Sequence, residues 1–327
     1  MSRVVRLALC ALSACVHGYS SAEWSAWKSL HAKSYPTAAE ESLRNQRWRE
    51  SFAEVSAHNA KRSSWKAGLN HFSDLSWEEF RSTVLMHGQN CSATHERTLW
   101  KPPLDKPLPI RIDWRNVGAL NAVKNQGKCG SCWTFSTTGS HEAHHFLKYG
   151  VMRNLSEQQL VDCAGAFDNH GCNGGLPSQA FEYLMSAGGH ESEDAYPYTA
   201  ATAKTCSFAS SRVEAKVASV VNITAYDESE LMQAVGLVGP VSIAFDVSSD
   251  FRHYAGGVYD GECKASPSEV NHAVVAVGYD DEAPGLGAHW IIRNSWGVRW
   301  GIDGYFKMRK GVNKCGISDC ASYPIVK

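Results

Sequence analysis

The stretch "NQGKCGSCWTF", residues 125–135, holds two cysteines separated by two residues. Cys129 and Cys132 at this spacing fit three chemistries: a redox pair, part of a metal site, or a reactive thiol beside a structural cysteine. A metal site would need a second cysteine pair at similar spacing, and the chain has none. A redox pair would need a strand before it, and "GALNAVKNQGK" lacks a strand pattern. The reactive thiol therefore fits best.

Cys132 opens an apolar-periodic segment that predicts a helix over 132–149. A cysteine in the first helical turn lies at the positive end of the helix dipole, which favours the thiolate. Such a nucleophile needs a histidine and a third group that orients it. His272 and Asn294 lie 140 and 162 residues downstream, and they are selected because this arrangement resembles the known spacing pattern of such cysteine nucleophiles. The side-chain amide of Gln126 would form an oxyanion hole with the Cys132 backbone N–H.

A second motif, "HEAHH", satisfies H-E-x-x-H, a pattern typical of zinc peptidases. His141 and His145 would share one helical face, with Glu142 between them. The extended form of the motif fails, because Lys148 and Val151 stand where a glycine and a third histidine are required. We interpret these histidines as surface or half-buried residues of the helix and expect no metal.

Composition places the chain among ordinary globular proteins. Its 327 residues allow about two domains, with 43% hydrophobic and 20% charged residues. The formal net charge of −1 gives no electrostatic basis for a nucleic-acid partner.

The N-terminus resembles a targeting signal. Arg3 and Arg6 accompany the apolar run "VVRLALCALSACV", and small residues follow it. This pattern predicts a signal peptide over residues 1–18, because the run is shorter than the roughly 20 residues that span a bilayer. No other segment is apolar enough to span a membrane. We therefore expect a product of the secretory pathway.

Cysteines and sequons agree with an oxidising compartment. Of eleven cysteines, Cys10 and Cys15 leave with the signal peptide, so nine remain and four bridges would leave one free thiol. Asn90 and Asn222 are predicted glycosylation sites. The third sequon, Asn154, is weakest because its Ser156 resembles a helix N-cap, with Gln159 completing a capping box.

Segment patterns predict an α+β fold with two lobes. Helices are expected within 23–62, after a cap at Ser73 or Ser76, and over 156–163. Residues 86–109 have four prolines and no periodicity, which predicts an exposed linker. Strands are expected in the later segments "VSIAFDV", "NHAVVAVGYD", "HWIIRNSW" and "GYFKMRK".

Taken together, these residues resemble the papain family of cysteine peptidases, most specifically in "NQGKCGSCWTFSTTG", "NHGCNGGLPSQAFEYL", "VNHAVVAVGY", "NSWG" and "CASYP". The resemblance implies a papain-like peptidase domain over 110–327, with a helical left lobe, a β-rich right lobe and a cleft between them. It implies these roles: Cys132 as nucleophile, His272 as acid and base, Asn294 orienting His272, Trp296 shielding that contact, Gln126 in the oxyanion hole, and Gly174 and Gly175 as substrate contacts. No cofactor is implied.

The same resemblance implies the disulfide pairing. The pairs are Cys129–Cys172, Cys163–Cys206, Cys263–Cys315 and Cys91–Cys320. They leave Cys132 free, in agreement with the count of nine cysteines.

The N-terminal region, 19–109, resembles an inhibitory propeptide. "GLNHFSD" supplies Gly68, Asn70, Phe72 and Asp74 of the G-x-N-x-F-x-D motif, and Glu40, Arg44 and Val55 fit the family's helical motif. In that motif Trp48 replaces a phenylalanine and Ser51 an asparagine. We therefore expect the helix to be kept and some of its polar contacts to change.

Residues 87–94, which include "QNCSAT", resemble the mini-chain of the cathepsin H-like branch. Tied to Cys320 through Cys91 and cut after Thr94, it would present a carboxylate to a substrate's α-ammonium. The implied enzyme is mainly an aminopeptidase with some endopeptidase activity, and a cathepsin L-like endopeptidase is the alternative. The resemblance also implies peptide and protein substrates, inhibition by the propeptide and by cystatin-type inhibitors, a monomer, and a lysosomal or extracellular location.

Overall fold

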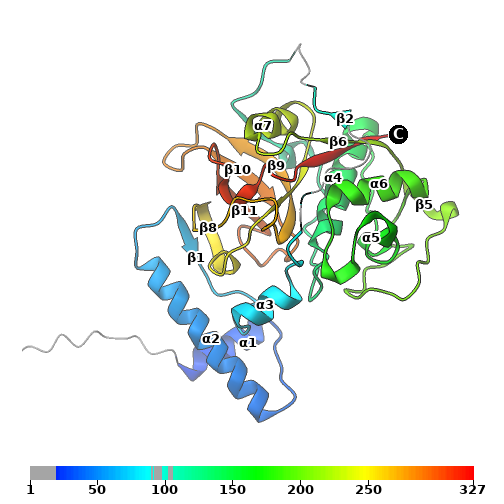
Figure 1. Ribbon diagram of the computed structural model, residues 1–327. Coiled ribbons are helices and arrows are strands. Elements are labelled where there is room, and N and C mark those ends of the chain that lie inside the picture. Colours follow the sequence, from blue (N-terminus) through cyan, green and yellow to red (C-terminus); the bar gives the residue numbers. More distant parts are fainter. Residues whose placement is uncertain (1–19, 90, 92–97, 102–105) are drawn as a thin grey trace, which may run out of the picture.

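A computed structural model describes residues 20–89, 91, 98–101 and 106–327, drawn in colour in Figure 1. The expected signal peptide, Asn90 and Thr94 lie outside these residues. Within the described chain, no helix combines the length and the apolar character needed to cross a membrane.

The N-terminal region contains the helices α1 (Ser21–Leu30), α2 (Ala38–Asn59) and α3 (Trp77–Thr83). Each follows a capping residue, Ser20, Thr37 or Ser76, whose side chain accepts the backbone N–H of a glutamate three positions later. Ser76 is thus the cap of α3, while the Ser73 hydroxyl accepts the Asn70 N–H at 2.9 Å. The helices expected within 23–62 are confirmed as α1 and α2.

Three tryptophans hold α1 against α2. Trp24, Trp27 and Trp48 are buried, and their ring centroids lie 5.3 to 6.4 Å apart. Trp48 therefore fills the core position that the family motif gives to phenylalanine. Ser51 is also buried, and its hydroxyl has no hydrogen-bond partner among the described residues. This agrees with the expected change in polar contacts on the helix.

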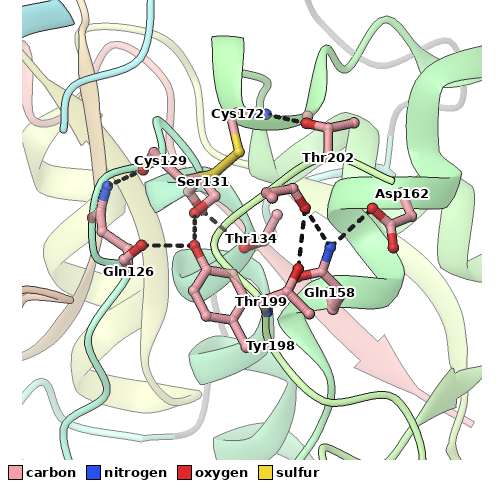
Figure 2. The surroundings of a disulfide bond; sticks show 12 residues. Gln126, Cys129, Ser131, Thr134, Gln158, Asp162, Cys172, Tyr198, Thr199 and Thr202 are labelled. Carbon is pink, nitrogen blue, oxygen red and sulfur yellow. Dashed lines mark hydrogen bonds between the residues drawn. A yellow bond between two sulfur atoms is a disulfide. The ribbon is translucent and has the colours of Figure 1, made fainter. Parts of the chain in front are cut away.

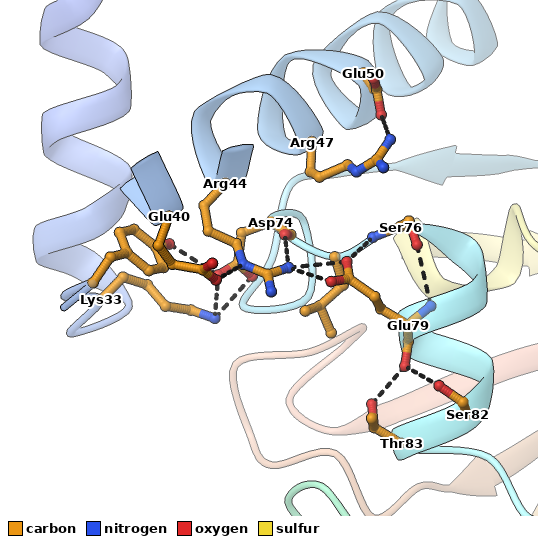
Figure 3. A network of polar contacts seen from close by, with 12 residues as sticks. Lys33, Glu40, Arg44, Arg47, Glu50, Asp74, Ser76, Glu79, Ser82 and Thr83 are labelled. Atoms are coloured by element: carbon orange, nitrogen blue, oxygen red, sulfur yellow. Dashed lines mark hydrogen bonds and ion pairs between the residues drawn. The ribbon is translucent and has the colours of Figure 1, made fainter. Parts of the chain in front are cut away.

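Arg44 joins α2 to α3, as Figure 3 shows. Its guanidinium donates to the Glu40 carboxylate at 2.7 Å, to both Glu79 oxygens at 2.9 Å and to the Asp74 carbonyl at 3.1 Å. The Asp74 carboxylate in turn accepts from Lys33 at 2.9 and 3.0 Å. A single arginine thus links the helical motif to the G-x-N-x-F-x-D segment.

The first half of the peptidase domain is helical, with α4 (Cys132–Tyr149), α5 (Glu157–Cys163) and α6 (Pro177–Ala187) grouped together in Figure 1. Helix α4 is buried from Cys132 to His145. Its small residues bond directly to neighbouring backbone: the Ser136 hydroxyl donates to the Val274 carbonyl at 2.6 Å, and Ser140 to Pro240 at 2.9 Å. These contacts fix α4 against the sheet.

Ser156 caps α5 as predicted, accepting the Gln159 N–H at 3.0 Å. The capping box itself is wrong, because the Gln159 amide group donates to the Gly189 carbonyl at 3.1 Å and accepts the Glu191 N–H at 2.7 Å. Because Gln159 is buried, its amide bonds residues far along the chain, which the capping-box motif does not take into account.

The second half forms most of a ten-stranded sheet in the described residues, ordered β1-β8-β11-β10-β9-β7-β12-β6-β2, with β3 also paired to β9. The strands are β1 (Trp65–Ala67), β2 (Thr98–Leu99), β3 (Arg111–Asp113), β6 (Val217–Asn222), β7 (Val241–Phe245), β8 (Tyr254–Tyr259), β9 (His272–Asp280), β10 (His289–Arg293), β11 (Tyr305–Arg309) and β12 (Ser322–Val326). A separate pair consists of β4 (His190–Glu191) and β5 (Val213–Ala215), and helix α7 (Glu228–Leu237) packs near β9. The four expected strands are confirmed as β7, β9, β10 and β11, and the α+β fold is confirmed.

The exposed linker expected over 86–109 is confirmed in part: His87, Gly88, Lys101 and residues 106–108 are exposed, whereas Met86 and Trp100 are not. Met86 is buried, and Gln89 forms a β-bridge with Val270. Trp100 is also buried, with its ring 6.2 Å from that of Tyr323. Prolines and the absence of periodicity predicted exposure throughout, but contacts with residues distant in the chain bury Met86 and Trp100.

The structure joins the four cysteine pairs that the resemblance implies: Cys91–Cys320, Cys129–Cys172, Cys163–Cys206 and Cys263–Cys315. Their Cα atoms lie 4.7 to 5.6 Å apart. Cys132 remains as a free cysteine.

We expect Arg44→Gln to destabilise the N-terminal region by about 1–3 kcal/mol, because Glu79 and the Asp74 carbonyl lose a charged donor. Arg47→Gln is the matched control: Arg47 lies one turn away on α2, with an ion pair to Glu50 at the surface. The measurement is urea unfolding, followed by tryptophan fluorescence in a Cys132→Ala background that prevents self-cleavage. Equal effects of the two substitutions would contradict the linking role of Arg44.

Candidate active site

Cys132 lies where the helical lobe meets the sheet. It is the first residue of α4, and its side chain is fully buried. Its Sγ accepts the backbone N–H of Ala273 at 3.3 Å. Because Ala273 is the second residue of β9, the helix and the strand begin side by side.

His272, the first residue of β9, is brought together with Asn294 and Trp296. Its Nε2 lies 2.8 Å from Asn294 Oδ1, and its ring centroid lies 4.6 Å from that of Trp296. All three side chains are buried. Since the amide oxygen of Asn294 accepts, Nε2 carries the proton and Nδ1 is the basic nitrogen. Nδ1 has no hydrogen-bond partner among the described residues.

Burial keeps the thiol and the imidazole neutral in this state. Burial raises the pKa of the Cys132 thiol to about 12, although backbone N–H groups of Ala273, Trp133 and Met86 act in the opposite direction. Burial also lowers the pKa of His272 to about 4, against the hydrogen bond to Asn294. The thiolate favoured by the helix dipole is therefore not the form expected while the N-terminal region covers the site.

Gln126 is oriented by residues on both sides of its amide. Its Oε1 accepts the Ser295 hydroxyl at 2.7 Å, so the NH₂ group points the other way. That group donates to the Cys129 carbonyl at 2.8 Å and to the Val84 carbonyl of the propeptide at 2.7 Å. The amide predicted for an oxyanion hole thus binds a propeptide carbonyl.

The turn between Gln126 and Cys132 is held at several points, as Figure 2 shows. Cys129 is tied to Cys172 by a disulfide, and the Gly130 N–H donates to the Cys172 carbonyl at 2.9 Å. A Cβ at Gly130 would lie 2.5 Å from that carbonyl oxygen, so only glycine fits here. The backbone approach brings the turn against the segment that contains Gly174.

The propeptide runs through the site with its backbone bonded on both sides. The Met86 N–H donates to the Asn271 carbonyl at 3.0 Å, and the His87 N–H donates to the Asn173 carbonyl at 3.0 Å. The Gln89 N–H then donates to the Val270 carbonyl at 3.1 Å. A substrate cannot bind these backbone partners while the segment occupies them.

The two predicted substrate-contact glycines face different surroundings. A Cβ at Gly174 would lie 2.7 Å from the Gln89 side chain and 2.9 Å from Met86, so this glycine lines the path of the propeptide. A Cβ at Gly175 would lie 2.2 Å from the Asn169 side chain and 2.8 Å from Trp133. The α-carbon of Gly175 therefore packs against the protein interior.

The H-E-x-x-H residues are buried, so their expected surface or half-buried position is wrong. His141 Nδ1 lies 3.2 Å from His190 Nδ1, and His145 Nδ1 lies 2.9 Å from the Val151 carbonyl. Glu142 accepts the Leu155 N–H at 2.9 Å and pairs with a lysine. The described residues contain no group of three side chains placed to bind a metal.

Sequence reasoning missed two contributors to this site. Ser295 sets the orientation of the Gln126 amide, and the Ala273 N–H bonds the sulfur. Ser295 follows Asn294 and Ala273 follows His272 in the chain, but this adjacency does not by itself indicate either contact. Asn222, a predicted glycosylation site, lies half-buried at the end of β6.

Two family models match the chain. Residues 108–325 match the papain family cysteine protease model, and residues 24–80 match the cathepsin propeptide inhibitor domain (I29). The chain belongs to the papain family and is a cysteine peptidase zymogen with a propeptide inhibitor domain.

Individual proteins agree over nearly the whole chain. The thiol protease aleurain of Arabidopsis thaliana is 52% identical over 303 residues, or 90% of this chain and 82% of that protein. Pro-cathepsin H of Mus musculus is 45% identical over 313 residues, or 95% and 92%. Among solved structures, digestive procathepsin L 3 of the Tenebrio molitor larval midgut has a TM-score of 0.85 at 38% identity, covering 93% of this chain and 98% of that one.

We expect iodoacetamide to alkylate Cys132 at least about 100-fold more slowly in the zymogen than in the processed enzyme at pH 7. The reason is that a thiol with a pKa near 12 is almost entirely protonated at that pH, and the propeptide also blocks access. Mass spectrometry of the labelled chain gives both rates, with Cys132→Ala as the control for labelling elsewhere. Equal rates would mean that the propeptide does not lower the reactivity of the Cys132 thiol.

Proposed function

We propose that this cysteine peptidase is mainly an aminopeptidase, with Cys132 as the nucleophile and residues 87–94 as a tethered specificity element. The observation that carries the proposal is the covalent link between Cys91 and Cys320, combined with backbone bonds that run along the site from His87 to Gln89. Relatives named aleurain and pro-cathepsin H support the same assignment.

Acylation begins when the propeptide leaves and water reaches the site. Exposure removes the burial that holds Cys132 and His272 neutral, so the thiol proton passes to His272 Nδ1. The thiolate attacks the substrate carbonyl carbon, and the carbonyl oxygen becomes an oxyanion. Gln126 Nε2, freed from the Val84 carbonyl, and the Cys132 backbone N–H donate to that oxyanion, a contribution of about 10²–10³ in rate per donor.

The intermediate then collapses, and the carbon–nitrogen bond breaks. His272 Nδ1–H gives its proton to the leaving amine, which leaves a thioester on Cys132. A water molecule loses a proton to Nδ1 and attacks the thioester, which releases the carboxylic acid product and restores the thiol. Asn294 Oδ1 keeps the imidazole in the required orientation through both steps.

The Cys91–Cys320 disulfide limits the positions that a new C-terminus at Thr94 can reach. Two residues lie between Cys91 and Thr94, so the span from one to the other is at most about 10 Å when the chain is extended. With Cys91 anchored at Cys320, a carboxylate at Thr94 would face the same half of the cleft that residues 87–89 occupy. A fixed anion there would pair with a substrate's free α-ammonium and exclude longer chains, which is the selectivity of an aminopeptidase.

The test compares two fluorogenic substrates that differ only in whether the α-amine is free or capped. We expect the processed wild type to prefer the free amine strongly, and Cys91→Ser to lose that preference because the tether is gone. Cys320→Ser breaks the same disulfide from the other end and is expected to match Cys91→Ser. If wild type cuts the capped substrate equally well, the enzyme is an endopeptidase and the cysteine-peptidase assignment still stands.

We further propose that the chain enters the secretory pathway and acts in lysosomes or outside the cell as a monomer, without a cofactor. Glycans at Asn90 and Asn222 and inhibition by cystatin-type proteins belong to the same proposal. The four disulfides support an oxidising compartment.

Acid release of the propeptide would use two histidines close to cations, the buried His31 and the half-buried His71. His31 and His71 lie with their rings 6.3 Å apart, and both ring nitrogens of His31 and Nε2 of His71 have no partner among the described residues. Burial, Lys33 and Arg299 lower the pKa of each histidine to about 4, while the Asp74 carboxylate acts weakly in the opposite direction. Protonation of either ring would place another positive charge near Lys33 and Arg299, at a position where burial already disfavours charge.

The sign of the pH effect follows from these shifts. A released propeptide binds protons at His31 and His71 near pH 6.5, whereas the packed propeptide does not until about pH 4, so packing loses stability between those values. Glu54 behaves differently: hydrogen bonds to His253 and Arg252 lower its pKa to about 2. Its contribution is complete above its ordinary pKa of 4.5 and is lost progressively as the pH falls from there to about 2, so it does not trigger release above about pH 4.5.

We expect His31→Gln with His71→Gln to shift the midpoint of acid-induced propeptide release to lower pH by at least about half a unit. The midpoint is read from tryptophan fluorescence of the Cys132→Ala zymogen, in which no self-cleavage occurs. His170→Gln, an exposed histidine of the peptidase domain, is the control. An unchanged midpoint in the double variant would eliminate these histidines as the acid sensor.

A further inference from the structure

Tyr198 reaches both ends of the turn that precedes the nucleophile. Figure 2 shows its hydroxyl between Ser131 and Gln126. Tyr198 Oη donates to the Gln126 backbone carbonyl at 2.8 Å and lies 2.6 Å from Ser131 Oγ. Since the phenol proton goes to the carbonyl, Ser131 is the donor in the second bond.

The tyrosine itself is held by its own surroundings. Its ring packs edge-on against Phe135 of α4, with centroids 4.9 Å apart, and its backbone N–H donates to the Glu193 carboxylate at 2.8 Å. Burial raises the pKa of the hydroxyl, so the proton stays on the oxygen throughout the range in which peptidases work. The bond to the Gln126 carbonyl is therefore present at every relevant pH.

The two residues bound by Tyr198 are directly connected to the two oxyanion donors. Gln126 carries the side-chain amide, and Ser131 immediately precedes the backbone N–H of Cys132. The disulfide of Cys129 fixes the middle of the turn, but it leaves the distance between the turn's ends to other contacts. A hydroxyl that bonds both ends restrains that distance.

We propose that Tyr198 is a positioning residue for the oxyanion hole, holding the Gln126 amide and the Cys132 N–H at the spacing that the transition-state oxygen requires. The proposal deepens the function proposed above and rests on it. Tyr198 touches neither substrate nor sulfur in this role and acts through Gln126 and Ser131. Preorganised donors of this kind lose much of their effect when their geometry relaxes.

Tyr198→Phe keeps the ring against Phe135 and removes the hydroxyl alone. With an amide substrate we expect kcat to fall about tenfold while KM changes by less than about twofold, since the loss falls on the transition state. The inhibition constant of a peptide aldehyde, whose hemithioacetal oxygen occupies the oxyanion hole, is expected to rise by a similar factor. Alkylation of Cys132 by iodoacetamide does not use that hole, so its rate and pH profile are expected to stay unchanged.

Tyr196→Phe is the matched control. Tyr196 lies two residues away, donates to the Asp162 carboxylate at 2.8 Å and accepts the Ser207 N–H at 3.1 Å. The same chemical change there is expected to leave kcat and aldehyde binding unaltered. Combining Tyr198→Phe with Gln126→Ala should add less than the sum of the single effects, because the tyrosine acts through that amide.

An unchanged kcat in Tyr198→Phe would overturn the proposal. So would a parallel fall in the alkylation rate, since that pattern would assign Tyr198 to the thiolate or to general folding. Failure of the underlying function gives a different result: the wild type would then keep its activity after complete alkylation of Cys132.

Discussion

Helix α4 and strand β9 begin at the same point, and the catalytic proposal depends on that contact. The Ala273 N–H bonds the Cys132 sulfur, while Ser136, one turn along α4, donates to the carbonyl of Val274. Consecutive residues of the strand therefore hold consecutive turns of the helix. Because neither element can slide without breaking both bonds, the sulfur and the imidazole on the preceding residue keep a fixed relation.

The propeptide silences the site mainly by excluding water. Its backbone bonds to both walls, and burial then favours the neutral forms of Cys132 and His272. The inhibited and the active enzyme thus differ in whether Cys132 and His272 are neutral or charged. The helix dipole and the Asn294 contact favour the ion pair in both states, but they prevail only when solvent can reach the charges.

The sequence predicted the proposed catalytic residues more reliably than the residues that hold them in position. Cys132, His272, Asn294 and Gln126 are chemically distinctive and stand in local motifs, so a single chain was enough to single them out. Tyr198 and Ser295 act through hydroxyls on partners 72 and 169 residues away, and no local pattern reports such contacts. The expectation for 86–109 was wrong at Met86 and Trp100 for the same reason, because their contacts are with Asn271 and Tyr323, far along the chain.

The side-chain amide of Gln126 has a hydrogen-bond partner in the zymogen and, in the proposed mechanism, another in the active enzyme. Its amide binds the Val84 carbonyl in the zymogen, at the place where a substrate oxygen would be polarised. A polarised carbonyl beside a nucleophile would invite cleavage, yet the neighbouring sulfur is protonated because its pKa is raised to about 12. The propeptide carbonyl therefore escapes cleavage at the oxyanion donor only while the propeptide also excludes water from the Cys132 thiol. Any partial opening that admits water would restore the nucleophile, so release and activation are coupled.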